Sequence, residues 1–133
     1  METTLKFLKI LPLALLALTF ISANPASADG DAAKGKKVFN KCRACHSAKP
    51  GKNMTGPSLF GVIGRKAGTA KGFTRYKGLK GADWTWNEKI LMEYLKDPRK
   101  YLKEKTGKNS LMVLKLRKES DRENVIAYLK TLK

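Results

Sequence analysis

Cys42, Cys45 and His46 carry the clearest chemistry in this sequence. Their C-x-x-C-H spacing is typical of the attachment site of a c-type haem. The two thiols can form thioethers with the haem vinyl groups, and the adjacent imidazole can then bind the iron from one face. The chain contains two cysteines and one histidine in all, so this motif uses every thiol and imidazole that it has.

Other interpretations of the cysteine pair fit less well. A Cys42–Cys45 disulfide would suit an exported structural domain without haem. A thioredoxin-like redox motif would also use C-x-x-C, but the βαβ pattern that accompanies it is missing. A zinc site needs a fourth ligand, and the sequence has no further cysteine or histidine. We therefore interpret the motif as a haem attachment site.

A haem bound by one histidine leaves the opposite face of the iron open, and Met54, Met92, Met112 or a lysine could fill it. A thioether suits iron in electron-transfer sites. Met92 falls in an expected helix, where methionine more often fills a core. Met54 follows His46 too closely to cross to the far side of the ring. We predict Met112 as the second ligand, because it follows a loop and precedes the last expected helix.

The N-terminal segment resembles a secretory signal peptide. A basic start, an apolar run over residues 10–21 and the small-residue sequence Ala26-Ser27-Ala28 form its usual three parts. An uncleaved membrane anchor is the alternative, but the run contains Pro12 and is shorter than the roughly 20 apolar residues of a spanning helix. We expect cleavage of residues 1–28 after Ala28, which leaves one periplasmic domain over residues 29–133.

The formal net charge of +17 is the strongest feature of the composition. Such a charge favours encounters with negatively charged partners. Nucleic acid is one candidate for so basic a chain, but export and the lack of a recognisable nucleic-acid-binding motif argue against it. We expect a lysine-rich surface that meets acidic patches on other proteins.

The elements that position the motif are expected to be helices joined by loops. Asp31 can cap a helix that runs towards Cys42. Residues 49–80 are rich in Gly, Pro, Lys and Thr, and we predict loops that wrap an apolar centre. The sequence from Thr85 to Glu88 fits a capping box, and apolar residues recur at helical spacing over residues 90–95.

The C-terminal third continues this helical pattern. Asp97-Pro98 should end the preceding helix or begin a short one, and residues 103–109 are predicted to form a basic surface loop. The sequence from Ser120 to Glu123 fits a second capping box, followed by a helix with an apolar face. That face consists of Val125, Ile126, Leu129 and Leu132. No segment alternates persistently with period two, so we predict an all-α domain.

Together these features resemble the class I cytochrome c family over essentially all of residues 29–133. The residues that carry the resemblance are Cys42–His46, Thr55-Gly56-Pro57, Gly61, Arg65, Gly72-Phe73-Thr74, Thr85-Trp86, Leu91-Met92-Glu93-Tyr94-Leu95, Pro98, Tyr101 and Val125-Ile126-Ala127-Tyr128-Leu129. The resemblance implies crossing N- and C-terminal helices, with loops around one covalent haem c and its iron. It also implies a non-enzymatic, monomeric electron carrier.

The resemblance assigns roles to single residues. The Pro57 carbonyl would accept the second imidazole N–H of His46, and Tyr94 would lie near the sulfur of Met112. The residues implied to contact the ring or its propionates are Leu59, Arg65, Trp86 and Leu95. At the helix crossing, Gly35 and Phe39 would pack against Val125 and Tyr128.

Two departures from the family pattern stand out. Arg75 occupies the place of a propionate-binding tyrosine, with Tyr76 displaced by one position, so either residue is a candidate for that contact. The stretch before Met112 is longer than in the mitochondrial type, and Leu111 replaces a basic residue there. The longer stretch resembles the bacterial members.

The resemblance also implies partners. Cations around the exposed haem edge would meet acidic surfaces of a cytochrome bc complex as donor, and of a terminal oxidase or reaction centre as acceptor. The cations are Lys37, Lys41, Lys52, Arg99, Lys100, Lys108, Arg117 and Lys118. A competing interpretation is an open-site haem protein, a gas sensor or weak peroxidase, in which Met112 leaves the iron.

Overall fold

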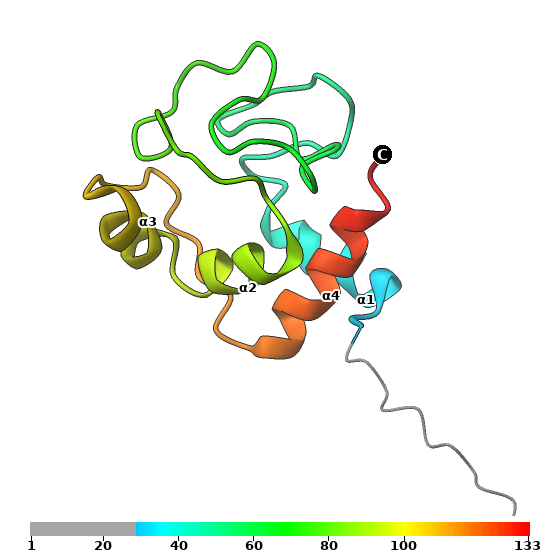
Figure 1. The fold of residues 1–133 in the computed structure, drawn as a ribbon. Coiled ribbons are helices and arrows are strands. Elements are labelled where there is room, and N and C mark those ends of the chain that lie inside the picture. The colour runs from blue at the N-terminus through cyan, green and yellow to red at the C-terminus, as the bar shows by residue number, and fades with distance from the viewer. Residues whose placement is uncertain (1–28) are drawn as a thin grey trace, which may run out of the picture.

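The computed structural model describes residues 29–133, and the predicted signal peptide over residues 1–28 lies outside the described part. The elements in chain order are α1 Ala32–Val38, the short 3₁₀ helix η1 Phe39–Lys41, α2 Glu88–Lys96, α3 Pro98–Thr106 and α4 Glu119–Lys130 (Figure 1). Within these residues, β pairing is limited to an isolated antiparallel bridge between Lys66 and Thr85. The predicted all-α class is therefore confirmed. None of the described helices is long and apolar enough to span a membrane.

Helix α1 begins where the sequence predicts. The side chain of Asp31 accepts a hydrogen bond from the backbone N–H of Lys34 at 3.0 Å, which satisfies one of the free donors at a helix N-terminus. The helix tightens into η1 at Phe39, and this short element leads directly into the Cys42 turn.

The predicted capping box at Thr85 is wrong. Helix α2 begins two residues later than that box requires, with Asn87 as its cap, and the Asn87 side chain accepts from the N–H of Ile90 at 2.8 Å. Thr85 pairs with Lys66 in the isolated bridge, and the N–H of Trp86 donates to the Arg65 carbonyl at 2.9 Å. This pairing holds the backbone extended until Asn87, so a helix cannot begin earlier.

The second predicted capping box is also wrong. Helix α4 is already helical at Glu119, and its cap residue Lys118 makes no side-chain capping bond. The guanidinium of buried Arg122 instead donates to the carbonyls of Leu116 and Arg117, at 2.7 and 2.9 Å. These two bonds fix the turn into α4 in place of a capping side chain.

Asp97 both ends α2 and caps α3, as its position before a proline predicts. Its side chain accepts from the N–H of Lys100 at 3.2 Å. The predicted loop over residues 103–109 is wrong at its start, because α3 continues to Thr106 and ends at Gly107, whose φ is +69°. Buried Leu102 anchors this otherwise polar helix to the core.

Helices α1 and α4 cross in close contact, as predicted (Figure 1). A Cβ atom at Gly35 would overlap the backbone carbonyl of Asn124 and lie 2.8 Å from the Cβ of Tyr128. The rings of Phe39 and Tyr128 pack with their centroids 5.2 Å apart. Glycine is tolerated inside α1 because the backbone of the other helix passes directly over it.

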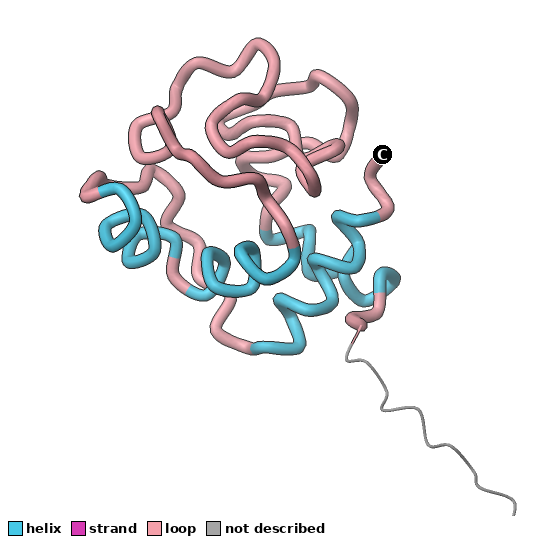
Figure 2. The backbone as a smooth tube through the Cα atoms, in the orientation of Figure 1, coloured by secondary structure: helices cyan, strands magenta, loops and turns pink. Residues whose placement is uncertain are grey.

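Loops form the other half of the molecule, opposite the helices (Figure 2). Residues 49–80 contain no helix or strand, in agreement with the sequence-based prediction. Long-range backbone bonds hold these loops in place: Gly61 donates to the Leu132 carbonyl, Gly64 to Trp86 and Ala67 to Trp84, at 2.8, 2.8 and 2.9 Å.

Candidate haem site

The C-x-x-C-H segment forms a turn directly after η1. The N–H groups of Cys45 and His46 both donate to the Cys42 carbonyl, at 3.1 and 2.9 Å. Cys42 is buried and Cys45 is exposed, and both are free thiols. Burial raises the pKa of the Cys42 thiol to about 11. The turn therefore presents two separate sulfur atoms beside one imidazole.

The backbone that follows fixes the imidazole of His46. Its Nδ1 lies 2.7 Å from the Pro57 carbonyl, so Nδ1 carries the proton and donates. The ring lies against Gly56, where a Cβ atom would fall 2.7 Å from Nδ1 and 2.9 Å from Nε2. The pKa of His46 is below its ordinary value, chiefly because the ring is buried; the Pro57 bond opposes this, and the Arg65 charge adds to it. The neutral ring keeps the Nε2 lone pair available as a metal ligand.

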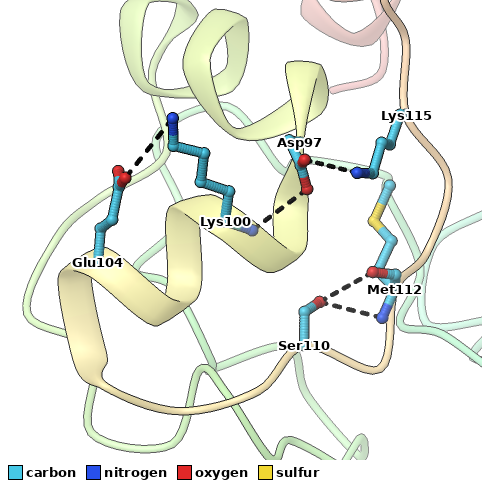
Figure 3. A network of polar contacts seen from close by, with 6 residues as sticks. All are labelled: Asp97, Lys100, Glu104, Ser110, Met112 and Lys115. Carbon is cyan, nitrogen blue, oxygen red and sulfur yellow. Dashed lines mark hydrogen bonds and ion pairs between the residues drawn. The ribbon is translucent and has the colours of Figure 1, made fainter.

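Met112 is held by contacts of a different kind. The hydroxyl of buried Ser110 accepts from the Met112 N–H at 3.0 Å and donates to the Met112 carbonyl at 3.1 Å (Figure 3). The Tyr94 hydroxyl donates to the Met112 sulfur at 3.7 Å. Burial raises the pKa of Tyr94 to about 12, so this donor stays protonated. A thioether sulfur has two lone pairs, and Tyr94 engages one of them.

An outer network joins the Met112 segment to the junction of α2 and α3. Lys115 donates to Asp97 at 2.6 Å, and Lys100 lies 3.8 Å from Glu104 (Figure 3). Further along the segment, the N–H of Leu116 donates to the carbonyl of Leu95 in α2 at 2.8 Å. The backbone on both sides of Met112 is thus tied to the helices.

Arg65, Tyr76 and Arg75 differ in what their side chains already bind. The Arg65 guanidinium donates to the carbonyls of Ser58 and Phe60, at 2.9 and 3.3 Å. The Tyr76 oxygen accepts from the N–H of Ala70 at 3.0 Å, which leaves its own proton free for another acceptor. Arg75 instead donates to a loop carbonyl and lies 5.5 Å from the centre of the Phe73 ring.

The structure gathers most of the remaining predicted site residues in one place. Cys42, Trp86, Tyr94 and Leu95 belong to the buried apolar core, and the side chains of Leu59 and Met112 pack against it. The ring centroids of Trp86 and Tyr94 lie 4.9 Å apart. His46, Pro57, Arg65 and Tyr76 are half-buried.

The predicted docking cations are all exposed: Lys37, Lys41, Lys52, Arg99, Lys100, Lys108, Arg117 and Lys118. Two of them have a carboxylate partner, because Lys41 pairs with Asp121 at 2.9 Å and Lys100 with Glu104 at 3.8 Å.

The sequence analysis did not identify Ser110, which bonds the Met112 backbone, or Trp84, whose ring packs against that of Trp86. The hydrogen bonds between Ser110 and the Met112 backbone could not be predicted, because the sequence shows only a serine two positions before a methionine. The indole N–H of Trp84 is buried and has no hydrogen-bond partner in the described part of the chain. Only tertiary structure shows that this donor is enclosed.

These residues fit a covalently attached haem. The chain presents two free thiols, a neutral imidazole oriented by a carbonyl and a thioether positioned by a hydroxyl, and histidine with methionine is an established ligand pair for haem iron. The buried donor of Trp84 adds a polar group that still lacks an acceptor. In residues 29–133, no group of three or more His, Cys, Asp or Glu side chains could hold a metal ion instead.

Comparison with known proteins shows the family to which this chain belongs. The sequence model of the family described as cytochrome c matches residues 32–133. Cytochrome c2 of Rhodospirillum rubrum is 42% identical over 126 residues, which cover 90% of this chain and 93% of the relative. Cytochrome c-550 of Paracoccus versutus is 40% identical over 137 residues, which cover 92% of this chain and 88% of the relative.

Solved structures give the same result for the fold. The structure of cytochrome c2 from Rhodospirillum centenum superposes with a TM-score of 0.72 at 40% identity, over 77% of this chain and 98% of the other. The family match spans all but the first three residues of the described domain, and the relatives are matched over nearly their full length. The chain belongs to the cytochrome c family, and its cofactor is a covalently bound haem c with iron.

Proposed function

We propose that this protein is a soluble periplasmic monohaem cytochrome c that shuttles single electrons between respiratory or photosynthetic redox partners. Cys42 and Cys45 would attach the haem, and His46 and Met112 would bind its iron. The main support for the proposal is that hydrogen bonds within the protein orient both proposed iron ligands. A carbonyl orients the imidazole of His46, while Ser110 and Tyr94 position the thioether of Met112.

When bound, the haem supplies the reversible one-electron couple of its iron. The bond from His46 to Pro57 strengthens the imidazole as a ligand, and a methionine ligand raises the reduction potential. Leu59 and Leu95 contribute apolar surface that keeps water from the ring. With His46 and Met112 both bound to the iron, no open position would remain there for a substrate, which favours a carrier over an enzyme.

The side chains with available donors would hold the propionates. Arg65 has a guanidinium whose pKa is lowered by burial, and a buried cation of this kind gains from an anionic partner. Tyr76 has a free hydroxyl proton, whereas Arg75 is already bound elsewhere. We therefore assign the propionate contact to Tyr76 and Arg65, and not to Arg75; the family resemblance adds Trp86.

The charge of the molecule supports the choice of partners. Basic residues outnumber acidic ones by far, with 28 and 11 in the chain. Such a surface steers the protein towards acidic patches on redox proteins. A cytochrome bc complex as donor, and a terminal oxidase or reaction centre as acceptor, are partners of this kind.

An optical spectrum tests the ligand assignment. The protein, expressed with a cytochrome maturation system, should show the weak sulfur-to-iron band of the oxidised form near the red end of the spectrum. Met112→Ala should abolish this band, and Met54→Ala should keep it. An unmodified protein without the band would indicate the open-site alternative, and a band that persists in Met112→Ala would refute the assignment.

A further inference from the structure

Asn53, in the loop that follows His46, makes two hydrogen bonds with its half-buried side chain. The amide oxygen accepts from the backbone N–H of Ser58 at 3.0 Å, and the amide nitrogen donates to the Lys71 carbonyl at 2.9 Å. Because one partner is a donor and the other is an acceptor, only one orientation of the amide satisfies both. The oxygen of Asn53 therefore faces Ser58.

The N–H of Ser58 belongs to the same peptide group as the carbonyl of Pro57. That carbonyl accepts the Nδ1 proton of His46 at 2.7 Å. The peptide is trans, so its N–H and its C=O point to opposite sides. One rigid group is thus hydrogen-bonded at both ends, to Asn53 on one side and to the His46 imidazole on the other.

Hydrogen bonds in a chain of this kind strengthen one another. When the N–H of a peptide donates, the C–N bond gains double-bond character and the carbonyl oxygen gains negative charge. The Pro57 oxygen then holds the Nδ1 proton of His46 more strongly, and the imidazole becomes a better electron donor at Nε2. A better donor favours the oxidised form of a bound metal ion.

We propose that Asn53 is a positioning residue for the haem ligand His46, and that it lowers the reduction potential through the peptide between Pro57 and Ser58. This inference rests on the proposed bond between His46 and the haem iron. It assigns to the oxygen of Asn53 a role that the nitrogen does not share, because only the oxygen bonds to that peptide.

The amide nitrogen of Asn53 has a separate, structural role. Through the Lys71 carbonyl it joins this segment to the loop that contains Tyr76, the proposed propionate contact. Gly72 lies beside the nitrogen, and a Cβ atom there would fall 3.5 Å from it. Loss of this bond should loosen the loop without changing the peptide that His46 contacts. Substitutions that affect the oxygen and the nitrogen differently therefore distinguish the two roles.

Three variants of the haem-loaded protein separate these roles. Asn53→Leu removes both bonds at nearly constant volume. Asn53→Asp keeps an oxygen that can accept from Ser58 and removes the donor to Lys71. Ser58→Ala is the matched control, because it keeps the peptide N–H. It loses only the bonds of the buried hydroxyl, which donates to the Lys49 carbonyl at 2.6 Å and accepts from the Phe60 N–H at 3.2 Å.

Two measurements report on His46. Redox titration gives the potential, and proton NMR of the reduced protein gives the chemical shift of the Nδ1 proton, which moves upfield when its hydrogen bond weakens. Asn53→Leu should raise the equilibrium constant for haem reduction about twofold, or about 18 mV for a one-electron couple, and should shift this proton upfield. Asn53→Asp should keep the proton at or downfield of its original position. Ser58→Ala should change neither quantity, although it should lower the free energy of unfolding in urea.

An Nδ1 proton that does not move in Asn53→Leu would overturn the inference, because Asn53 would then only join two loops. An equal upfield shift in Asn53→Asp or in Ser58→Ala would also overturn it, because the effect would follow the loosening of the loop instead of the loss of the acceptor. If Asn53→Leu does not retain haem, the other two variants decide by this criterion.

The same spectra test the proposed function separately. The ring current of a haem shifts the carbon-bound protons of an axial imidazole strongly upfield. If these protons of His46 lack that shift in the unmodified protein, the proposed ligation fails and this inference fails with it. If they show the shift while the Nδ1 proton stays in place in Asn53→Leu, the inference alone is overturned.

Discussion

At the scale of single residues, different kinds of contact hold the two proposed iron ligands in place. The imidazole of His46 is fixed by the backbone of Gly56 and Pro57, which follow it closely in sequence. The thioether of Met112 depends on the side chains of Ser110 and Tyr94, and Tyr94 lies 18 positions away. The first arrangement follows from a short motif, whereas the second requires the folded chain.

Tyr94→Phe should lower the reduction potential. The hydroxyl draws electron density from the Met112 sulfur, and without it the sulfur donates more strongly and favours the oxidised iron. One hydrogen bond of this strength corresponds to roughly 20–60 mV for a one-electron couple. Redox titration measures the shift. Tyr101→Phe, in the same aromatic cluster, is the control and should shift the potential less. A potential that stays constant or rises in Tyr94→Phe would contradict this account.

At the scale of elements, local signals predicted the helices well where nothing else competed for the backbone. Asp31 caps α1, Asp97-Pro98 divides α2 from α3, and the predicted apolar face of α4 is buried at Val125, Ile126 and Leu129. The C-x-x-C-H motif and Pro57 lie within one short segment, and the contact between Pro57 and His46 that the family resemblance implied is present in the structure.

Where the sequence-based predictions were wrong, tertiary contacts are the reason. Thr85 has the residue types of a capping box, but its pairing with Lys66 holds it extended. Residues 103–106 are polar, yet they continue α3 because Leu102 is anchored in the core. The position of the Met112 backbone depends on the Ser110 hydroxyl, which bonds both its N–H and its carbonyl. None of these contacts can be predicted from neighbouring residues.

Gly35→Ala tests the crossing of α1 and α4. Helix propensity alone would favour alanine by about 1 kcal/mol. The added methyl would overlap the Asn124 carbonyl, and forcing an atom into a packed contact of this kind costs about 3 kcal/mol. We therefore expect a lower free energy of unfolding, measured by urea titration. Ala33→Gly, at an exposed position of α1, should cost about 1 kcal/mol. A Gly35→Ala protein more stable than the unmodified one would refute the close crossing.

Asp97 should make stability depend on pH. The hydrogen bond from Lys115 is the main cause that holds the Asp97 pKa below its ordinary value of 3.8, and the Lys100 N–H adds to it. A carboxyl with a lowered folded pKa stabilises the fold above its unfolded pKa, and this stabilisation is lost as the pH falls through the folded value. Unfolding free energy should therefore fall below about pH 4, and less steeply in Asp97→Asn.

Urea unfolding across the acidic range measures the Asp97 effect. Asp83→Asn is a suitable control, because the Asp83 side chain is exposed and makes no ion pair with the described residues. It should keep the pH dependence of the unmodified protein. Identical slopes for Asp97→Asn and the unmodified protein would show that the Lys115 contact does not stabilise the fold.

The whole molecule combines a helical half and a loop half (Figure 2) around an apolar core. Its surface is predominantly positive. With 28 basic and 11 acidic residues, most cations cannot find a carboxylate partner within the chain. The excess charge is therefore available to partners. It acts over about 30 Å at low ionic strength and over about 8 Å at physiological salt.

Small redox reagents of opposite charge test this field without a protein partner. The reduced protein should transfer electrons to hexacyanoferrate(III), an anion, at a rate that falls at least about tenfold between ionic strengths of about 0.01 M and 0.2 M. With the cation tris(phenanthroline)cobalt(III), the rate should rise over the same range, because salt screens a repulsion instead of an attraction. Because the two rates should change in opposite directions with ionic strength, the comparison distinguishes the electrostatic field of the protein from a general effect of salt on the haem. Equal salt dependence for the two reagents would show that electrons leave through a surface where the net charge of +17 is not felt.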